Sequence, residues 1–223
     1  MSSILVRRAN MVVAGSGPTP GRLPAGYTEL AYLKGDGSAY INTGFKTQQV
    51  DKLVGKVAFE TLGSSNQYIA GSRVTTASTS TAIGYAVYAS SHGGFTYYPA
   101  AWPTNSVGVA ITANQIISFE TYIGTSSQSF TVDGVLKNSG TATISKGTSS
   151  MTLTLFGLHT DSNIQYAVAG TRIYAMTLYF NGSKIAEYVP AMRDQDSVVG
   201  MYDLVSDSFL TNAGSGTFSY GTL

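Results

Sequence analysis

Residues 172–192, RIYAMTLYFNGSKIAEYVPAM, contain two runs of alternating apolar and polar residues separated by a short turn. This alternation is typical of half-buried β-strands, because successive side chains of a strand point to opposite faces. The dipeptide Asn181-Gly182 falls between the runs, and it suits a tight hairpin turn because both residues tolerate positive φ angles. The stretch therefore predicts an antiparallel β-hairpin.

The same pattern extends over the rest of the chain. Residues 130–138, FTVDGVLKN, predict a second hairpin with Asp133-Gly134 in its turn, and neither hairpin implies a site. The composition, with 25 Gly and 15 Tyr, is rich in turn and strand formers. No fixed period recurs, so a propeller or solenoid is excluded, and an all-β sandwich is expected. Further strands are expected at residues 27–34, 39–45, 52–62, 67–73, 82–90, 95–100, 115–124 and 151–159.

Charge, cysteine content and hydropathy exclude several classes of protein. The formal net charge is +1 and only 11% of residues are charged, so the chain lacks the field that a nucleic-acid partner requires. Cysteine is absent, which excludes disulfides, thiol catalysis and cysteine-bound metals. No apolar run approaches the roughly 20 residues that span a bilayer. The apolar stretch 11–14 is too short for a signal peptide, so we expect synthesis in a cytoplasm.

The N-terminal residues form a separate segment. Residues 1–22 are expected to be a docking arm and Gly/Pro linker, and residues 23–223 a sandwich domain. An apolar strand on a tether needs a sheet edge to pair with, and that edge belongs either to a neighbouring subunit or to its own domain. The residues expected to dock are Ile4, Leu5, Val6, Arg7, Arg8, Met11, Val12 and Val13.

Two stretches resemble a known family. Residues 23–45, LPAGYTELAYLKGDGSAYINTGF, carry a Leu-Pro-x-Gly-Tyr opening, and residues 172–218 end in a Gly-x-Tyr-Asp phrase followed by TNAGSGTF. Both resemble the laminin-G/concanavalin A-like domain common in phage, prophage and gut-bacterial surface proteins. The resemblance implies a two-sheet antiparallel jelly-roll sandwich with an extended N-terminal arm. It also implies an appended binding or display module.

No catalytic constellation is found in the sequence. A sandwich glycosidase needs paired carboxylates, typically as Glu-x-Asp-x-x-Glu, and that string does not occur. No serine lies in a Gly-x-Ser-x-Gly elbow, and His92 and His159 are not spaced as metal ligands. We therefore expect a protein that is not an enzyme and has no cofactor. The four glutamates stand apart, at Glu29, Glu60, Glu120 and Glu187.

An acidic cluster near the C-terminus leaves two interpretations open. Laminin-G-like modules often hold Ca²⁺ with carboxylates and carbonyls, so these residues are a candidate calcium site. The other interpretation is structural, with the first two accepting backbone N–H groups in a turn and the third ordering a buried strand crossing near Tyr202. The cluster comprises Asp194, Asp196, Asp203 and Asp207.

The candidate glycan-binding residues lie in residues 93–105, GGFTYYPAAWPTN. Sugar rings stack on exposed aromatic planes, and neighbouring amides hydrogen-bond to their hydroxyls. The alternative is that the tyrosine and the tryptophan plug the end of the sandwich. The candidates are Tyr97, Tyr98, Trp102 and Asn105, with Phe95 beside them.

These observations favour an accessory structural protein of a bacteriophage virion: a capsid decoration, head fibre or tail component. Its arm would anchor it to capsid or tail subunits at the virion surface, and its sandwich would display a glycan-binding surface. The apolar arm favours self-association, and a trimer is expected because such fibres and decorations are often trimeric, although no heptad supports a number. The alternative is a carbohydrate-binding module or adhesin of a gut bacterium.

Overall fold

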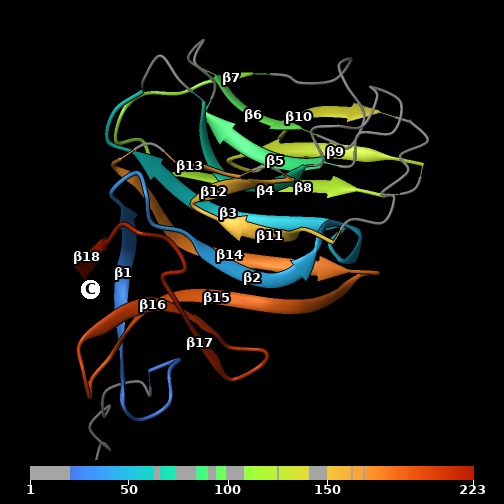
Figure 1. Cartoon of the computed structure of the whole chain (residues 1–223). Helices are drawn as coiled ribbons and strands as arrows, with labels where there is room; N and C mark the ends of the chain where they lie inside the picture. The colour runs from blue at the N-terminus through green and yellow to red at the C-terminus, as the bar shows by residue number, and fades with distance from the viewer. Residues whose placement is uncertain are drawn as a thin grey trace, which may run out of the picture.

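Two β-sheets face each other in the computed structural model (Figure 1). It describes residues 21–62, 66–73, 84–89, 94–98, 108–124, 126–140, 150–161, 163–167 and 169–223. The predicted docking residues between Ile4 and Val13 lie outside these ranges, so the arm and the boundary at residue 22 stay predictions. Within the same ranges, no helix is long and apolar enough to cross a membrane.

The larger sheet has ten strands in the described part of the chain. Nine follow one another in the order β10-β9-β8-β3-β14-β1-β15-β16-β17, and β18 pairs with β1. All of its pairings are antiparallel. The strands are β1 (Tyr27–Gly35), β3 (Lys52–Phe59), β8 (Ile117–Ile123), β9 (Gln128–Val132), β10 (Val135–Gly140), β14 (Thr171–Phe180), β15 (Ser183–Arg193), β16 (Val198–Asp203), β17 (Ser208–Thr211) and β18 (Phe218–Thr222).

The smaller sheet has eight strands in those ranges. Six follow the order β13-β12-β4-β5-β6-β7, while β11 pairs with both β2 and β4. Its pairings are antiparallel apart from β4 with β12, which run parallel. A 3₁₀ turn, η1 (Thr47–Gln49), follows β2. The strands are β2 (Ile41–Lys46), β4 (Gln67–Arg73), β5 (Gly84–Ala89), β6 (Gly94–Tyr98), β7 (Val109–Ala110), β11 (Thr152–Leu155), β12 (Gly157–Thr160) and β13 (Ile164–Tyr166).

Strand β1 divides the larger sheet into two arms. β14 and β15 pair as a hairpin near their shared turn and then separate, and β1 lies between them (Figure 1). Leu33 of β1 lies opposite Ile173 of β14, whereas Tyr27 lies opposite Arg193 of β15. β18 pairs with β1 between Leu30 and Gly35. The sequence stretches 23–45 and 172–218 therefore fold together as one unit.

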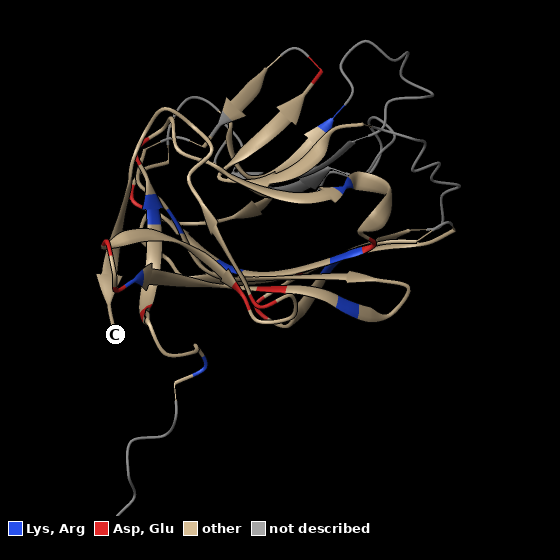
Figure 2. Cartoon of the chain, turned by 60° about the horizontal axis from the view of Figure 1, so that its bottom comes forward, with Lys and Arg blue, Asp and Glu red and all other residues tan. Residues whose placement is uncertain are grey.

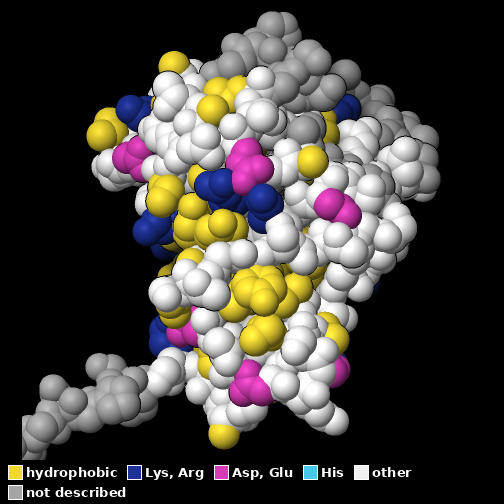
Figure 3. Space-filling view, turned by 90° about the vertical axis from the view of Figure 1, so that its left-hand side faces the viewer, with side chains coloured by type: hydrophobic (Ala, Val, Ile, Leu, Met, Phe, Trp, Pro, Cys, Tyr) yellow, Lys and Arg dark blue, Asp and Glu magenta, His cyan; other side chains and the backbone are white. Residues whose placement is uncertain are grey.

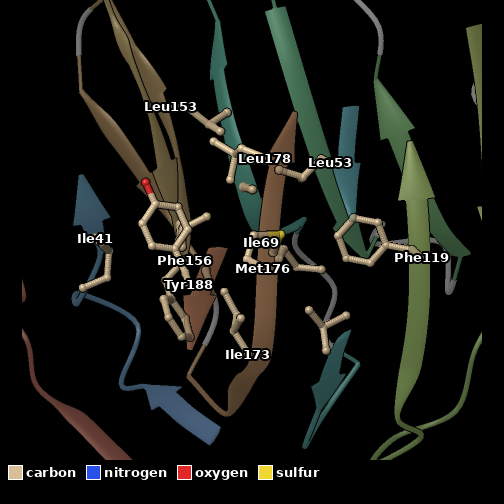
Figure 4. Packing of buried hydrophobic residues seen from close by; sticks show 14 of the residues in the cluster. Ile41, Leu53, Ile69, Phe119, Leu153, Phe156, Ile173, Met176, Leu178 and Tyr188 are labelled. Atoms are coloured by element: carbon tan, nitrogen blue, oxygen red, sulfur yellow. The ribbon is translucent and has the colours of Figure 1, made fainter. Parts of the chain in front are cut away.

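The main core fills the space between the sheets (Figure 4). Ile173, Met176 and Leu178 of β14 project toward Ile69 of β4 and Leu153 of β11. All five side chains are fully buried, which is the ordinary source of stability for a sandwich without disulfides.

A second, smaller core is formed by buried side chains of β15 and β16. Val189, Ala191 and Tyr202 form it, and Tyr27 and Phe209 pack against it. The ring centroids of Tyr27 and Tyr202 are 4.8 Å apart, and those of Tyr27 and Phe209 are 5.2 Å apart. The expected burial of Tyr202 is confirmed, because only 3% of its surface is exposed.

Both predicted hairpins are confirmed. Asn181 and Gly182 have φ angles of 50° and 76°, and Asp133 and Gly134 have φ angles of 49° and 76°. Two positive φ angles in succession are those of the tight turn expected from each dipeptide. The strand predicted at 151–159 differs, since it is interrupted at Phe156, where φ is 62°. The chain there passes from β11 to β12, and the alternation is lost, because Phe156 and its neighbours from Leu153 to Leu158 are all buried.

A clasp joins the loop at residues 36–40 to the loop at residues 212–217. Asn212 Oδ1 accepts hydrogen bonds from the backbone N–H groups of Tyr40 at 3.1 Å and Gly214 at 2.9 Å. Its amide donates to the carbonyl oxygens of Gly216 at 2.6 Å and Gly214 at 3.3 Å. The TNAGSGTF phrase therefore has a structural role, because one asparagine holds the two loops in register.

Asp36 makes the second half of the clasp. Its carboxylate accepts the backbone N–H groups of Ser38 at 2.9 Å, Ala39 at 3.2 Å and Thr217 at 2.6 Å. Burial alone would raise the pKa of Asp36, but the hydrogen bonds from Thr217 and Ser38 together outweigh it, so the pKa lies below its ordinary value. A Cβ atom at Gly216 would overlap this carboxylate, which explains the glycine there.

Candidate functional site

The predicted glycan-binding residues are only partly covered by the structure. Tyr97 and Tyr98 occupy the end of β6, where the backbone but not their side chains is described. Trp102 and Asn105 lie outside the described residues, so this site stays a prediction. Phe95 as a ligand-facing residue is wrong. It is fully buried in the main core, and its ring centroid lies 5.4 Å from that of Phe119.

A different group of aromatic and charged side chains gathers on the larger sheet. Lys34 of β1 and Arg172 of β14 are register partners in adjacent strands. Two like charges placed directly opposite repel each other, so this pairing needs a compensating charge. Glu60 Oε1 supplies it by accepting hydrogen bonds from both cations, from Lys34 Nζ at 3.0 Å and from the guanidinium of Arg172.

Glu60 is held in place by the loop before β14. The backbone N–H of Glu60 donates to the carbonyl oxygen of Gly170 at 3.1 Å. Gly170 has a φ of +91°, and a Cβ atom there would come within 2.9 Å of the Glu60 Cβ. Glycine is therefore favoured at position 170 both by its φ angle and by the space that Glu60 occupies. The bonds from Arg172 and Lys34 hold the pKa of Glu60 below its ordinary value, so the carboxylate stays ionised.

Two tyrosines complete this group. The pairing of β14 with β3 shifts between Ile173 and Ala175, so Tyr174 is an extra, unpaired residue on β14. Its ring makes an edge contact with that of Tyr32 on β1, with centroids 5.4 Å apart. The guanidinium of Arg172 lies over the Tyr32 ring at 5.1 Å, and Lys56 Nζ lies over the Tyr174 ring at 5.9 Å.

We call these six residues the cation–tyrosine cluster: Tyr32, Lys34, Lys56, Glu60, Arg172 and Tyr174. Its tyrosines are half-buried and Lys56 is exposed, so rings and ammonium groups both reach solvent. Figure 3 shows basic and acidic side chains beside hydrophobic ones on the side of the molecule that carries β1. Elsewhere on the described strands the two signs of charge are interleaved (Figure 2).

A second cation–aromatic contact lies farther along the same two strands. Lys52 of β3 is the register partner of Tyr179 of β14, and its Nζ lies 4.3 Å from the Tyr179 ring centroid. The same ammonium lies 3.6 Å from the carboxylate of Glu120. The Lys52–Glu120 pair is electrically neutral, unlike the cation–tyrosine cluster.

The four glutamates, which are far apart in the sequence, each form an ion pair with a lysine or an arginine. Glu120 and Glu187 share one row across the larger sheet, since Glu120 lies opposite Val54, Val54 opposite Thr177, and Thr177 opposite Glu187. Three strand spacings separate the two carboxylates by about 14 Å, too far for the roughly 5–9.5 Å of a glycosidase pair. The ion pairs are Arg22–Glu29, Lys34–Glu60, Arg172–Glu60, Lys52–Glu120 and Lys184–Glu187.

The aspartates considered for calcium have separate partners. Asp194 accepts a hydrogen bond from the Thr28 hydroxyl at 2.7 Å, and Asp207 accepts one from the Tyr202 hydroxyl. Asp196 accepts from Arg193 Nη2 at 2.7 Å. Asp203 accepts backbone N–H groups from Glu187 at 2.9 Å and Val205 at 3.0 Å. No group of three or more acidic or histidine side chains comes together in the described ranges. The backbone bonds to Asp196 and Asp203 agree with the structural interpretation, whereas the described bond to Asp194 comes from a hydroxyl and not from the predicted backbone N–H group.

Histidine contributes no site in the described ranges. His159 Nδ1 lies 3.0 Å from the carbonyl oxygen of Thr152, a contact between β12 and the start of β11. His159 is half-buried, and its strand lies between β13 and β4. His92 lies outside the described residues.

Sequence reasoning missed the cation–tyrosine cluster. The period-2 pattern of KLVGKVAF does place Lys56 on a polar face, whereas strict alternation in RIYAMTLYF would put Arg172 on the same face as Met176 and Leu178. The sequence pattern does not predict that β3, β14 and β1 are neighbours in the sheet. It also does not predict the extra residue of β14 at Tyr174. Tertiary pairing alone brings these residues together.

No protein-family model and no curated protein matches the sequence. Solved structures do match. A putative carbohydrate binding protein from Bacteroides ovatus aligns with a TM-score of 0.59 at 9% identity, covering 88% of this chain and 61% of that one. The CBM40 of the Ruminococcus gnavus IT-sialidase aligns with a TM-score of 0.50 at 12% identity, covering 71% of this chain and 92% of that one.

This chain has a concanavalin A/laminin-G-like jelly-roll fold. Mouse laminin α1 domains LG4-5 also match, at a TM-score of 0.43 and 16% identity over 80% of this chain and 48% of that one. The two facing sheets and the likeness to the structure with a TM-score of 0.59 confirm the jelly roll predicted from the opening and closing stretches. At these identities the likeness concerns the fold, and what this jelly roll binds has to be argued from its own surface.

Proposed function

We propose that the chain is a carbohydrate-binding jelly-roll domain that acts by binding and not by catalysis. The observation that carries this proposal is the likeness over 88% of the chain to a structure described as a putative carbohydrate binding protein. The CBM40 of a sialidase, at a TM-score of 0.50, supports the same class. The cation pairing of all four glutamates supports the non-catalytic part, because no glutamate is left without a basic partner.

The cation–tyrosine cluster supplies suitable chemistry. A half-buried tyrosine offers a ring edge and face for the apolar C–H side of a sugar and a hydroxyl for hydrogen bonding. Lysine and arginine offer eight N–H donors between them, and sugar hydroxyls accept from such groups. Tyr32 and Tyr174 are fixed by their mutual contact and by the cations above them, so little ordering is needed on binding.

The setting of this domain is a separate question. The alternative of a bacterial carbohydrate-binding module or adhesin agrees with the structural similarities. The virion decoration, its capsid or tail partners, its trimeric state and its surface location stay predictions of the sequence, because none of the similar structures bears on them.

A glycan array probed with the purified chain tests the proposal, followed by titration calorimetry with any glycan retained. Two substitutions then locate the site. Tyr174→Ala is expected to weaken binding if the larger sheet carries the site, and Trp102→Ala if residues 93–105 carry it. Tyr68→Ala, at a half-buried tyrosine of β4 in the smaller sheet, is the control. No retention across neutral and acidic glycans would contradict the proposal.

A further inference from the structure

The cation–tyrosine cluster concentrates positive charge. It contains three cations, Lys34, Lys56 and Arg172, and one carboxylate, Glu60, so its net charge is +2. The whole chain, with 13 basic and 12 acidic residues, has a net charge of only +1. The remainder of the molecule is therefore slightly acidic, and the positive potential is local to this part of the larger sheet.

The cluster is built to keep its cations together. Lys34 and Arg172 would repel each other as register partners, and one glutamate holds both. Lys56 lies over Tyr174 with no ion pair to a described residue, and its ammonium is exposed. A neutral sheet surface would be more stable without this crowding, so the excess charge points to an anionic ligand.

We propose that the cation–tyrosine cluster binds the anionic group of an acidic glycan, with Lys56, Arg172 and Lys34 facing the anion and Tyr32 and Tyr174 contacting the sugar ring. This inference rests on the proposed carbohydrate-binding function and adds the ligand class. Carboxylate and sulfate substituents both fit, because each is a planar or compact oxyanion that accepts several charged N–H donors.

The surroundings favour a glycan over a charged polymer. A nucleic acid needs a row of cations that follows its phosphates, whereas basic and acidic residues are both scattered over the described strands (Figure 2). Tyrosines packed between the cations instead suit a ring that is apolar on one side and carries one charged group. The same arrangement predicts a single ion-pair contact and therefore a shallow dependence of binding on salt concentration.

The test compares how tightly the chain binds matched neutral and acidic glycans. The full chain is titrated with lactose, 3′-sialyllactose and 3′-sulfated lactose, which share a neutral core and differ in the anionic group, alongside an array that holds many neutral and acidic pairs. Lys56→Met removes the exposed ammonium and keeps the length of the side chain. Lys137→Met on β10, another exposed lysine of the same sheet, is the matched control.

We expect acidic members of a pair to bind more tightly than neutral ones, and Lys56→Met to weaken binding of the acidic ligand about three- to tenfold, the range of one ordinary hydrogen-bonded contact at a solvent-exposed site. Glu60→Gln removes the competing carboxylate and is expected to tighten binding of the acidic ligand by a similar factor. Lys137→Met is expected to change neither. A melting curve for each variant confirms that it is folded.

The outcomes separate the two proposals. Equal binding of neutral and acidic glycans, unchanged by Lys56→Met and Glu60→Gln, would overturn the acidic ligand and leave carbohydrate binding in place. Absence of binding to every glycan would overturn both. Retention by a DNA oligonucleotide that is lost in Lys56→Met, without retention by any glycan, would reassign the cluster to nucleic acid. A preference between the carboxylate and the sulfate ligand would identify the anion.

Discussion

Replacing Asn212 by alanine tests whether the clasp between residues 36–40 and 212–217 holds the end of the fold together. The substitution removes four hydrogen bonds, two accepted and two donated by one side chain. A typical intramolecular hydrogen bond contributes about 0.5–1.5 kcal/mol net, and the clasp is only part-buried, so water replaces some of the loss. We therefore expect the free energy of unfolding to fall by about 3 kcal/mol.

The measurement is thermal and urea unfolding followed by circular dichroism. For a chain of this length, about 3 kcal/mol corresponds to a lowering of Tm by roughly 6–12 °C. Asn42→Ala is the control, because Asn42 Oδ1 accepts only one local bond in its described contacts, from the Gly44 N–H at 3.0 Å. Gly214→Ala is expected to disrupt the same clasp by steric overlap, since its Cβ would overlap the carbonyl oxygen of Ser38. If Asn212→Ala melts within about 2 °C of Asn42→Ala, the clasp does not stabilise the fold.

Three further predictions concern the cores and the carboxylates. Tyr202→Ala empties the centre of the second core and should lower the unfolding free energy by about 3 kcal/mol in urea, whereas melting like wild type would contradict its burial. Gly55→Ala places a methyl group against the ring of Phe119 and the sulfur of Met176. This overpacking should lower the unfolding free energy by about 1–3 kcal/mol in the same assay. An unchanged urea midpoint would show that the core relaxes without cost. Asp36 has a pKa lowered by folding, so its stabilising contribution is complete above about pH 5 and is lost as the pH falls through the folded pKa. The stability difference between wild type and Asp36→Asn should therefore shrink from about pH 5 toward pH 3, and a difference that grows on acidification would refute the cause.

The hairpins and most strands could be predicted because their causes are local. Asn181-Gly182 and Asp133-Gly134 adopt the positive φ angles that each dipeptide favours, whatever the rest of the molecule does. The strand at residues 67–73 agrees with its prediction at both ends. Phe156 shows the limit of local reasoning. Its φ of 62° is unfavourable for a bulky residue. It occurs where the chain passes from β11 to β12, and the neighbouring residues in the sequence do not predict this change of strand.

The candidate site was mostly hidden from the sequence. Phe95 looked like a ligand-facing aromatic because it stands among tyrosines and glycines, but its position in β6 turns it into the core. Lys34, Glu60 and Arg172 are far apart along the chain, and none lies in a recognisable motif. Their proximity depends on the order of β3, β14 and β1 in the larger sheet, which the turn residues do not encode.

The sequence by itself determined the class of this protein: short strands, two tight turns and a composition rich in strand and turn formers lead to an all-β sandwich. These features are read from neighbouring residues, where steric preferences and side-chain periodicity act. The jelly roll was implied by the resemblance of two phrases to a known family. The tertiary structure alone decided the division of the larger sheet by β1, the clasp of Asp36 and Asn212, and the cation–tyrosine cluster. Those features arise from pairing between strands distant in sequence, and pairing is settled by the burial of whole faces, not by any local pattern.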